Sequence, residues 1–284
     1  MLDRVGRVVP RSLFAGLVDD AALFPPGNAP MVSALVEHAA HRTAWYSDVV
    51  GPFLCPASRL DEMRAALPPD QSVELALVFD VTGDQAHAAL RAAASDQRVT
   101  LVAVEAAHAR LGDDAAAVSA NLARLPGATR FLEVPRTGLD AALDLVGGSG
   151  WHAAKYRTGG TTPDAFPSEV ELASFLVAAT TRALPFKLTA GLHHALRCST
   201  DEGFEQHGVL NVLVATRVAT AGAGAADVAI VLAQRESGAL VELVQRWDAE
   251  TCTDVRRAFR SFGCCGVTDP IEDLVALGLL DRPA

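Results

Sequence analysis

Short apolar runs recur along the chain and are separated by alanine-rich stretches with a helical pattern of apolar positions. Most runs begin roughly 30 residues apart, which is the size of one strand-plus-helix unit. The runs span residues 12–20, 49–56, 73–80, 99–106, 129–135, 152–158 and 184–191, and a weaker eighth run spans 258–266. Each run is short and rich in β-branched or aromatic residues, so we expect a buried strand at each.

The segments between the runs read as amphipathic helices. Examples are "DEMRAALPP", "DQAHAALRAAAS" and "DDAAAVSANLARL". Strands that alternate with helices predict a parallel sheet covered on both faces. Seven or eight such units in 284 residues predict a (β/α)8 TIM barrel, formed as a single domain by residues 1–284. An open doubly wound sheet is the alternative, but the first run is followed by "VDDAALFPPG" and not by its usual glycine-rich turn.

The stretch before the eighth run is longer than one helix requires. It holds "HGVLNVLVATRVATA" and a second helical pattern that begins at "AADVAIVLAQ". We therefore expect a helical insertion at 207–250, before the last strand, which serves either as a lid or as a contact between subunits.

Composition excludes several classes of partner. The net charge is −10 and no basic stripe is present, so a nucleic-acid partner is not expected. No apolar run reaches the length of a membrane span, and the first residues lack the pattern of a secretory signal. Five cysteines, odd in number and scattered, favour a reducing cytoplasm. We expect a cytoplasmic protein with a small-molecule substrate and no cofactor, and a homo-oligomer stays open.

Charged or reactive residues stand at the ends of the predicted strands. In a parallel barrel the carboxyl ends of the strands build the site, so these side chains should surround one mouth. A single acid there could simply cap its strand, but a whole ring indicates a binding site. The ring comprises Asp20, Cys55, Asp80, Glu105, Glu133, Lys155, Arg157, Lys187 and Thr189.

Lysine occurs at only two positions, Lys155 and Lys187, among 24 lysines and arginines. Lysine can lose its proton when buried and can form a Schiff base, whereas arginine does neither at ordinary pH. Alternation along a strand puts Lys155 on the face of Arg157, and Lys187 on the face of Thr189. If both faces point inward, two neighbouring ammonium groups should disfavour double protonation and leave one amine nucleophilic. The alternative is a structural network in which both lysines pair with Glu105, Glu133 or Asp80.

Two loops add further candidates. "RTGGTTPDAFPS" follows the sixth run, and its turn at Thr158, Gly159 and Gly160 could cradle an anion with backbone N–H groups. Ser168 and Glu171 then predict a helix with a capping box. "AGLHHALR" follows the seventh run and brings His193 and His194 near the mouth as general acids or bases.

The segments "AAKYRTGGTTPDAFPSEVEL" and "PFKLTAGLHHALR" together resemble the deoxyribose-phosphate aldolase family of class I aldolases. The resemblance covers about 45 residues and implies that Lys155 forms the Schiff base and that Lys187 lowers its pKa. Thr158 and Gly159 match the turn after the first lysine. Two departures are that "GLHH" stands in place of the family's Gly-Gly phosphate loop, and that Arg157 stands where the family has a small residue. Similar motifs, K-x-R-T-G-G and F-K-x-T-A-G-L-H-H, also occur in bacterial proteins to which no chemistry is assigned.

The leading hypothesis is a Schiff-base-forming lyase of aldolase type that acts on a small anionic carbonyl compound. Glu105, Glu133 and His193 or His194 would move protons, and Arg157 with the Gly159–Gly160 turn would hold the anion. One alternative is a non-covalent barrel enzyme that binds phosphate or carboxylate through Lys155, Arg157 and Lys187. Others are a metal-dependent hydrolase or lyase that uses His193, His207 and acids, and a ligand-binding barrel without catalysis.

Overall fold

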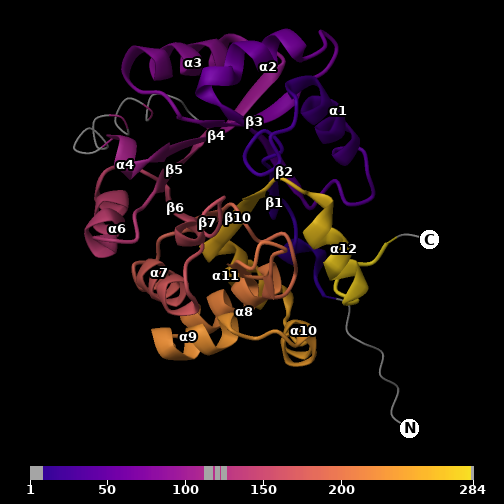
Figure 1. The fold of residues 1–284 in the computed structure, drawn as a ribbon, viewed down its shortest axis with the longest axis vertical. Helices are drawn as coiled ribbons and strands as arrows, with labels where there is room; N and C mark the ends of the chain where they lie inside the picture. The colour runs from indigo at the N-terminus through magenta and orange to yellow at the C-terminus, as the bar shows by residue number, and fades with distance from the viewer. Residues whose placement is uncertain (1–8, 112–117, 119–121, 123–126, 283–284) are drawn as a thin grey trace.

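Eight parallel strands close into a barrel in the computed structural model, which describes residues 9–111, 118, 122 and 127–282. The order around the barrel is β1-β10-β7-β6-β5-β4-β3-β2 (Figure 1). This confirms the predicted TIM barrel, and the weak eighth run is the strand β10. The strands are β1 Val18–Asp20, β2 Val50–Pro56, β3 Val73–Val78, β4 Val99–Ala107, β5 Thr129–Glu133, β6 Ala153–Arg157, β7 Phe186–Thr189 and β10 Phe259–Cys264.

Helices surround the barrel, and most lie where the sequence pattern predicts them. The helix expected at "DDAAAVSANLARL" lies outside the described residues except for positions 118 and 122. The helix that follows β6 begins after Ser168, which caps it in a capping box with Glu171 as predicted. The helices up to β7, and the one after β10, are η1 Arg11–Leu13, α1 Met31–His41, η2 Ala57–Arg59, α2 Leu60–Ala66, α3 Gly83–Ser95, α4 His108–Leu111, α6 Leu139–Gly148, η4 Pro163–Ala165, α7 Glu169–Thr181 and α12 Thr268–Ala276.

The first predicted strand is shorter than expected. Its run was placed at 12–20, but residues 11–13 form a 3₁₀ turn and the strand begins only at Val18. Gly16 lies between them with a φ of +55°, a left-handed conformation that breaks an extended chain. The prediction of an extended run from residue 12 was therefore wrong.

Four helices and a small hairpin separate β7 from β10, and the helices predicted within 207–250 are confirmed. Nearly every face of the first of these four helices, Val209–Thr220, is buried, because it packs against neighbouring helices on several sides. Figure 1 shows the first two of these helices beside α7; the second and third lie on the outside of the molecule, and the fourth packs against β10. Whether this group of helices acts as a lid or as an interface stays a prediction. The elements are the hairpin β8 Cys198–Ser199 with β9 Glu205–Gln206, and the helices α8 Val209–Thr220, α9 Ala225–Leu232, α10 Ser237–Val244 and α11 Ala249–Ala258.

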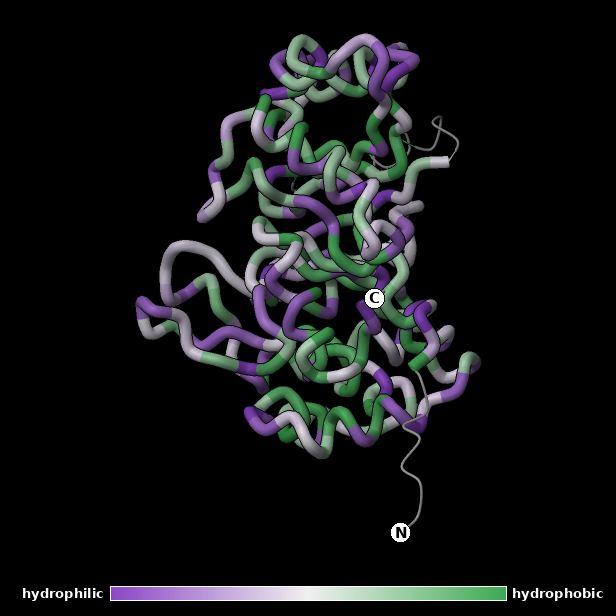
Figure 2. Tube along the Cα trace, turned by 90° about the vertical axis from the view of Figure 1, so that its right-hand side faces the viewer, coloured by the Kyte–Doolittle hydropathy of each residue, from purple (hydrophilic) through white to green (hydrophobic). Residues whose placement is uncertain are grey.

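The two faces of the barrel wall differ in side-chain size. Outward residues are large, and Tyr156 stacks on Phe175 of α7 with ring centroids 4.3 Å apart. Figure 2 shows hydrophobic residues concentrated in the middle of the molecule and hydrophilic residues at the protruding loops. Within the described residues no helix has both the length and the apolar character needed to cross a membrane.

The inside of the barrel is built largely from small residues. Barrel interiors usually contain bulky branched side chains, but here the inner apolar cluster joins Phe131 and Leu54 to alanines. The alanines are Ala21, Ala76, Ala103 and Ala153. This choice of residues leaves room inside the wall for the long charged side chains of the neighbouring positions.

Candidate active site

The two lysines lie side by side inside the barrel. Lys155 on β6 is the register partner of Lys187 on β7, and Glu133 on β5 is the partner of Lys155. Partner positions on neighbouring strands are about 5 Å apart at their backbones. Both lysine side chains are almost completely buried. The prediction that they share the inner face of adjacent strands is therefore confirmed.

Lys187 is enclosed by two carboxylates. Its Nζ lies 2.5 Å from Oδ2 of Asp19 and also forms an ion pair with Oε1 of Glu105. The same nitrogen lies 5.2 Å from the centre of the Phe131 ring, and Ser261 donates a hydrogen bond of 2.8 Å to Asp19. Burial favours the neutral amine, but the two carboxylates outweigh it and raise the pKa of Lys187 above its ordinary value. These contacts therefore favour the ammonium form of Lys187.

Lys155 is paired with carboxylates too, but it lies nearer the opening. Its Nζ is 2.8 Å from Oε2 of Glu105 and 3.1 Å from Oε2 of Glu133. The other oxygen of Glu133 accepts a hydrogen bond of 3.1 Å from Nε of Arg157. We call Asp19, Glu105, Glu133, Lys155 and Lys187 the lysine cluster.

Glu105 supplies one oxygen to each lysine and lies between them. Burial works to raise the pKa of Glu105, but Lys155 and Lys187 outweigh it and lower that pKa to about 2. The pKa of Glu133 is also lowered, because Lys155 and Arg157 outweigh the effect of burial. Burial has the opposite result at Asp19, where it raises the pKa more than Lys187 lowers it. We expected the two ammonium groups to repel each other directly. That expectation is wrong, because the fully buried carboxylate of Glu105 lies between them.

A cavity of about 740 Å³ opens at the carboxyl ends of the strands above the lysine cluster. Lys155 and Glu133 line it, together with Arg157, whose side chain is half exposed. Lys187, Glu105 and Asp19 are not among its lining residues and lie beneath them. Only one of the two amines therefore faces the space that a ligand can fill.

Asp20 does not belong to this site, although the sequence placed it in the ring. Its Oδ2 lies 2.9 Å from Nδ1 of His38 on α1, and its Oδ1 accepts a hydrogen bond from the N–H of Ala22. Neighbouring side chains on a strand point to opposite faces, so Asp19 points inward and Asp20 points outward. Val18, which is buried on the same outer face as Asp20, is the sequence signal that could have identified Asp19.

Asp80 lines the cavity at its rim, but its carboxylate already has partners. It accepts hydrogen bonds from the backbone N–H and the hydroxyl group of Ser58. Asp80 therefore holds the start of η2 in place, and the alternative pairing of Asp80 with a lysine is not found.

The loops after β6 and β7 are joined through the turns that the sequence singled out. The hydroxyl group of Thr158 donates a hydrogen bond of 2.6 Å to the carbonyl oxygen of Ala190. A Cβ on Gly159 would lie 2.9 Å from the backbone nitrogen of Gly191, so only glycine permits this approach. Gly160 and Thr189 line the cavity. Thr158 and Gly159 therefore shape the mouth, and binding of an anion by this turn stays a prediction.

His193 lines the cavity, whereas His194 is exposed beside a neighbouring groove. Nδ1 of His193 lies 3.4 Å from Oδ2 of Asp269, and its Nε2 lies 3.7 Å from the sulfur of Cys265. Nδ1 of His194 pairs with Asp273 at 3.1 Å. The two adjacent histidines thus point apart, and of the two only His193 is placed to reach a ligand in this cavity.

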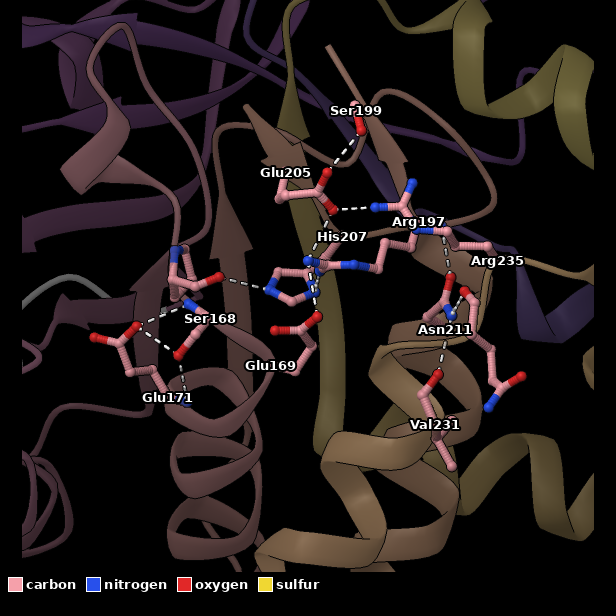
Figure 3. A network of polar contacts seen from close by, with 12 residues as sticks. Ser168, Glu169, Glu171, Arg197, Ser199, Glu205, His207, Asn211, Val231 and Arg235 are labelled. Carbon is pink, nitrogen blue, oxygen red and sulfur yellow. Dashed lines mark hydrogen bonds and ion pairs between the residues drawn. The ribbon is translucent and has the colours of Figure 1, made fainter. Parts of the chain in front are cut away.

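His207 belongs to a separate buried network beside the barrel (Figure 3). Its Nε2 donates to the carbonyl oxygen of Pro167 at 2.8 Å, and its Nδ1 accepts from Arg197 at 3.3 Å. Arg197 also pairs with Glu169 at 2.8 Å and with Glu205 at 3.0 Å. Burial, and then Arg197, lower the pKa of His207 to about 4.

Asn211 extends this network into the insertion. It accepts a hydrogen bond from the backbone N–H of Arg197 and donates to the carbonyl oxygens of Val231 and Gln234. We call Glu169, Arg197, Glu205, His207 and Asn211 the arginine cluster. Its contacts tie the β8–β9 hairpin to the start of α7 and to α8 and α9.

A metal site built on His193 and His207 has no geometric support. Both ring nitrogens of His207 are already occupied by Pro167 and Arg197. In the part of the chain that the structure describes, no three His, Cys, Asp or Glu side chains come together as metal ligands would.

Comparison of the sequence with models of known protein families and with curated proteins finds no match to either.

Proposed function

We propose that the protein is a Schiff-base-forming lyase of aldolase type that acts on a small anionic carbonyl compound. The observation that carries the proposal is the position of Lys155. Lys155 lines an open cavity, and its amine lies 3.1 Å from the carboxylate of Glu133, which also lines that cavity. A TIM barrel with its polar residues at the carboxyl ends of the strands is compatible with such an enzyme.

The reaction begins when the Lys155 ammonium group gives a proton to Glu133 and its lone pair attacks the substrate carbonyl carbon. A carbinolamine forms, and loss of its hydroxyl group as water gives the iminium ion. The β-hydroxyl group of the substrate then gives up its proton, the bond between the α and β carbons breaks to release an aldehyde, and the iminium ion accepts the electron pair to become an enamine. Protonation of the enamine at the α carbon re-forms the iminium ion. Water finally hydrolyses the iminium ion and restores the free lysine.

The neighbouring residues support the same chemistry. Glu133 is well placed to take and return the proton, because it contacts Lys155 and faces the cavity. Lys187 and Glu105 lie beneath Lys155 and form an ion pair, so that their charges offset each other. Arg157 is half exposed at the cavity and can hold an anionic group of the substrate. His193, at the rim beside Asp269, is in position to move a proton on the carbonyl or leaving-group side.

A second candidate is a non-covalent enzyme that uses the same cations to bind a phosphate or carboxylate. The favouring observation is that Arg110 and Arg157 line the cavity together with Lys155. In that case Lys155→Arg should keep part of the activity, because an arginine still binds an anion. A Schiff-base enzyme should lose all of it, because arginine forms no imine.

The test is reduction with borohydride in the presence of small aldehydes and 2-oxo acids, read by intact mass. The chain has only two lysines, so the primary amines that can react are these two and the N-terminal amine. We expect wild-type protein to gain one reduced adduct and Lys155→Arg to gain none.

The matched control is Arg246→Lys, which adds a lysine at a position whose side chain is 75% exposed. We expect no adduct at residue 246, because that lysine lacks the cavity and the paired carboxylates. An equal adduct in the wild type and in Lys155→Arg would contradict the proposal.

A further inference from the structure

The cavity above the lysine cluster has two unlike halves. The half contributed by β5, β6, β7 and the loops after them is polar, and its lining side chains include Glu133, Lys155, Arg157, Thr161, Thr162 and Thr189. The half contributed by β1 to β3 and their loops is mainly apolar, and it includes Leu23, Phe24, Pro26, Leu54, Pro56 and Val78. Since the strands follow one another around the barrel in this order, each half forms a continuous surface.

The apolar half offers few groups to a polar ligand. Among its described residues and those that follow β4, the charged ones are Asp80 and Arg110. Asp80 is held by Ser58, and Arg110 donates a hydrogen bond of 3.3 Å to the backbone oxygen of Asp80. Both stand at the rim. Deeper in, Leu54 belongs to the inner apolar cluster of the barrel, and Val78 packs against that cluster.

This division has a direct consequence for ligand preference. A hydroxyl or phosphate group placed against Leu54 and Val78 would lose its water without gaining a partner. A methylene group buried there would raise affinity by about fourfold, the equivalent of the usual transfer free energy of one CH₂. The cavity, at about 740 Å³, has room for more than a two- or three-carbon compound.

We propose that the substrate is a carbonyl compound that carries an aliphatic or aromatic group. This inference rests on the proposed function, because Lys155 fixes where the carbonyl carbon lies. The carbonyl and any anionic group face Lys155 and Arg157, and the apolar group lies against Leu54, Val78 and Phe24. The apolar half of the cavity disfavours polyhydroxylated and phosphorylated carbonyl compounds.

The first test compares 2-oxo acids in the borohydride assay at a series of concentrations. The apolar probes are 4-methyl-2-oxopentanoate and phenylpyruvate, and the polar probes are hydroxypyruvate and 2-oxoglutarate, with pyruvate as the reference. We expect half-maximal trapping of the apolar probes at a concentration at least about tenfold below that of pyruvate. Polar probes that are trapped as well as the apolar ones would overturn the inference and leave the Schiff-base chemistry in place.

A matched pair of variants tests whether the preference for apolar substrates arises from the apolar half of the cavity. Val78→Thr replaces one methyl group of the apolar half by a hydroxyl group and keeps the shape of the side chain. Val170→Thr makes the same change on α7, where Val170 is 64% exposed. We expect Val78→Thr to reduce the preference for 4-methyl-2-oxopentanoate over pyruvate several-fold, and Val170→Thr to leave it unchanged. An unchanged preference in a folded Val78→Thr protein would show that the apolar half of the cavity does not cause the preference, and would overturn the inference.

The last measurement separates failure of this inference from failure of the proposed function. The carboxylates 4-methylpentanoate and glutarate have no carbonyl group and form no imine, and their binding can be followed by ligand-observed NMR. We expect 4-methylpentanoate to bind and glutarate to bind more weakly. If this preference holds while no 2-oxo acid is trapped, the proposed chemistry fails and the division of the cavity stands. If glutarate binds better, the division fails regardless of the trapping result.

Discussion

The lysine cluster and the arginine cluster each pair a buried cationic side chain with carboxylates. The lysine cluster has two lysines and three carboxylates inside the barrel. The arginine cluster has one arginine, one histidine, two glutamates and an asparagine outside it. Buried charge alone therefore does not distinguish the two.

Their surroundings do distinguish them. In the arginine cluster, His207 and Asn211 form hydrogen bonds with backbone carbonyl oxygens and with Arg197. The cluster therefore connects helices and loops to one another. In the lysine cluster Lys155 and Glu133 face a cavity that a ligand can enter. The difference teaches that a buried ionic group becomes a candidate for chemistry when one of its reactive atoms borders accessible space.

The largest expected difference between the clusters is in trapping of a carbonyl compound. Lys155→Arg should reduce adduct formation by a factor of about 10³ or more, because the nucleophile is lost. Arg197→Met, in the arginine cluster, should leave adduct formation in the folded protein nearly unchanged. Intact mass after borohydride reduction of both variants measures this, and equal losses in the two would remove the distinction.

The next effect concerns stability. Glu105→Gln removes the charge shared by both lysines, and we expect the free energy of unfolding to fall by about 3–5 kcal/mol. Glu242→Gln is the control, because Glu242 is 68% exposed and forms a longer ion pair of 3.5 Å with Arg246. Urea denaturation compares the two. A Glu105→Gln protein as stable as the control would mean that the lysines need no counter-charge from Glu105.

The pH dependence of stability should separate the clusters as well. The folded-state pKa of His207 is lowered from 6.5 to about 4. The unfolded chain therefore binds a proton first as the pH falls, and stability is lost between pH 6.5 and about 4, by about 3 kcal/mol at most. Glu105, with its pKa lowered from 4.5 to about 2, contributes stability that is lost only at lower pH, from about 4.5 downward.

Denaturation by urea across this pH range, in wild type and His207→Gln, tests the assignment. We expect the decline between pH 6.5 and 4 to become shallower in His207→Gln, and the decline below pH 4.5 to remain. An identical profile in the two proteins would show that His207 does not carry the upper part of the decline.

The smallest effect is expected at Gly51 on β2. A Cβ at this position would collide with the carboxylate of Asp19, which would have to move away from Lys187. We expect Gly51→Ala to lower the free energy of unfolding by about 1–3 kcal/mol. Gly148→Ala at the end of α6, where a Cβ would meet no atom within 4 Å, is the control in the same thermal or urea assay. A neutral Gly51→Ala would show that Asp19 can shift at no cost.

Much of the barrel follows from the sequence, because its strands are buried on both faces and its helices are amphipathic. The adjacency of Lys155 and Lys187 also follows, since each is in phase with a second polar residue on its strand. Asp19 was missed because "VDD" has two adjacent acids, and the phase of a three-residue strand is hard to assign. Ser261 was missed because it lies on the weak eighth run.

Features that depend on distant contacts were beyond the sequence. Nothing in the pattern around His207 indicates that Arg197 and Pro167 would occupy both of its ring nitrogens. Glu105 likewise looks like one acid of a ring, and its place between the lysines depends on the lateral order of β4 to β7. The apolar half of the cavity is assembled from loops and strands far apart in the chain, from Leu23 to Val78.

The central claim is that the two lysines differ in role because only Lys155 faces the cavity. Peptide mapping of wild-type protein after borohydride reduction with a trapped 2-oxo acid tests this most directly. The account predicts a reduced adduct on Lys155 and an unmodified Lys187. An adduct on Lys187 with Lys155 unmodified would contradict it.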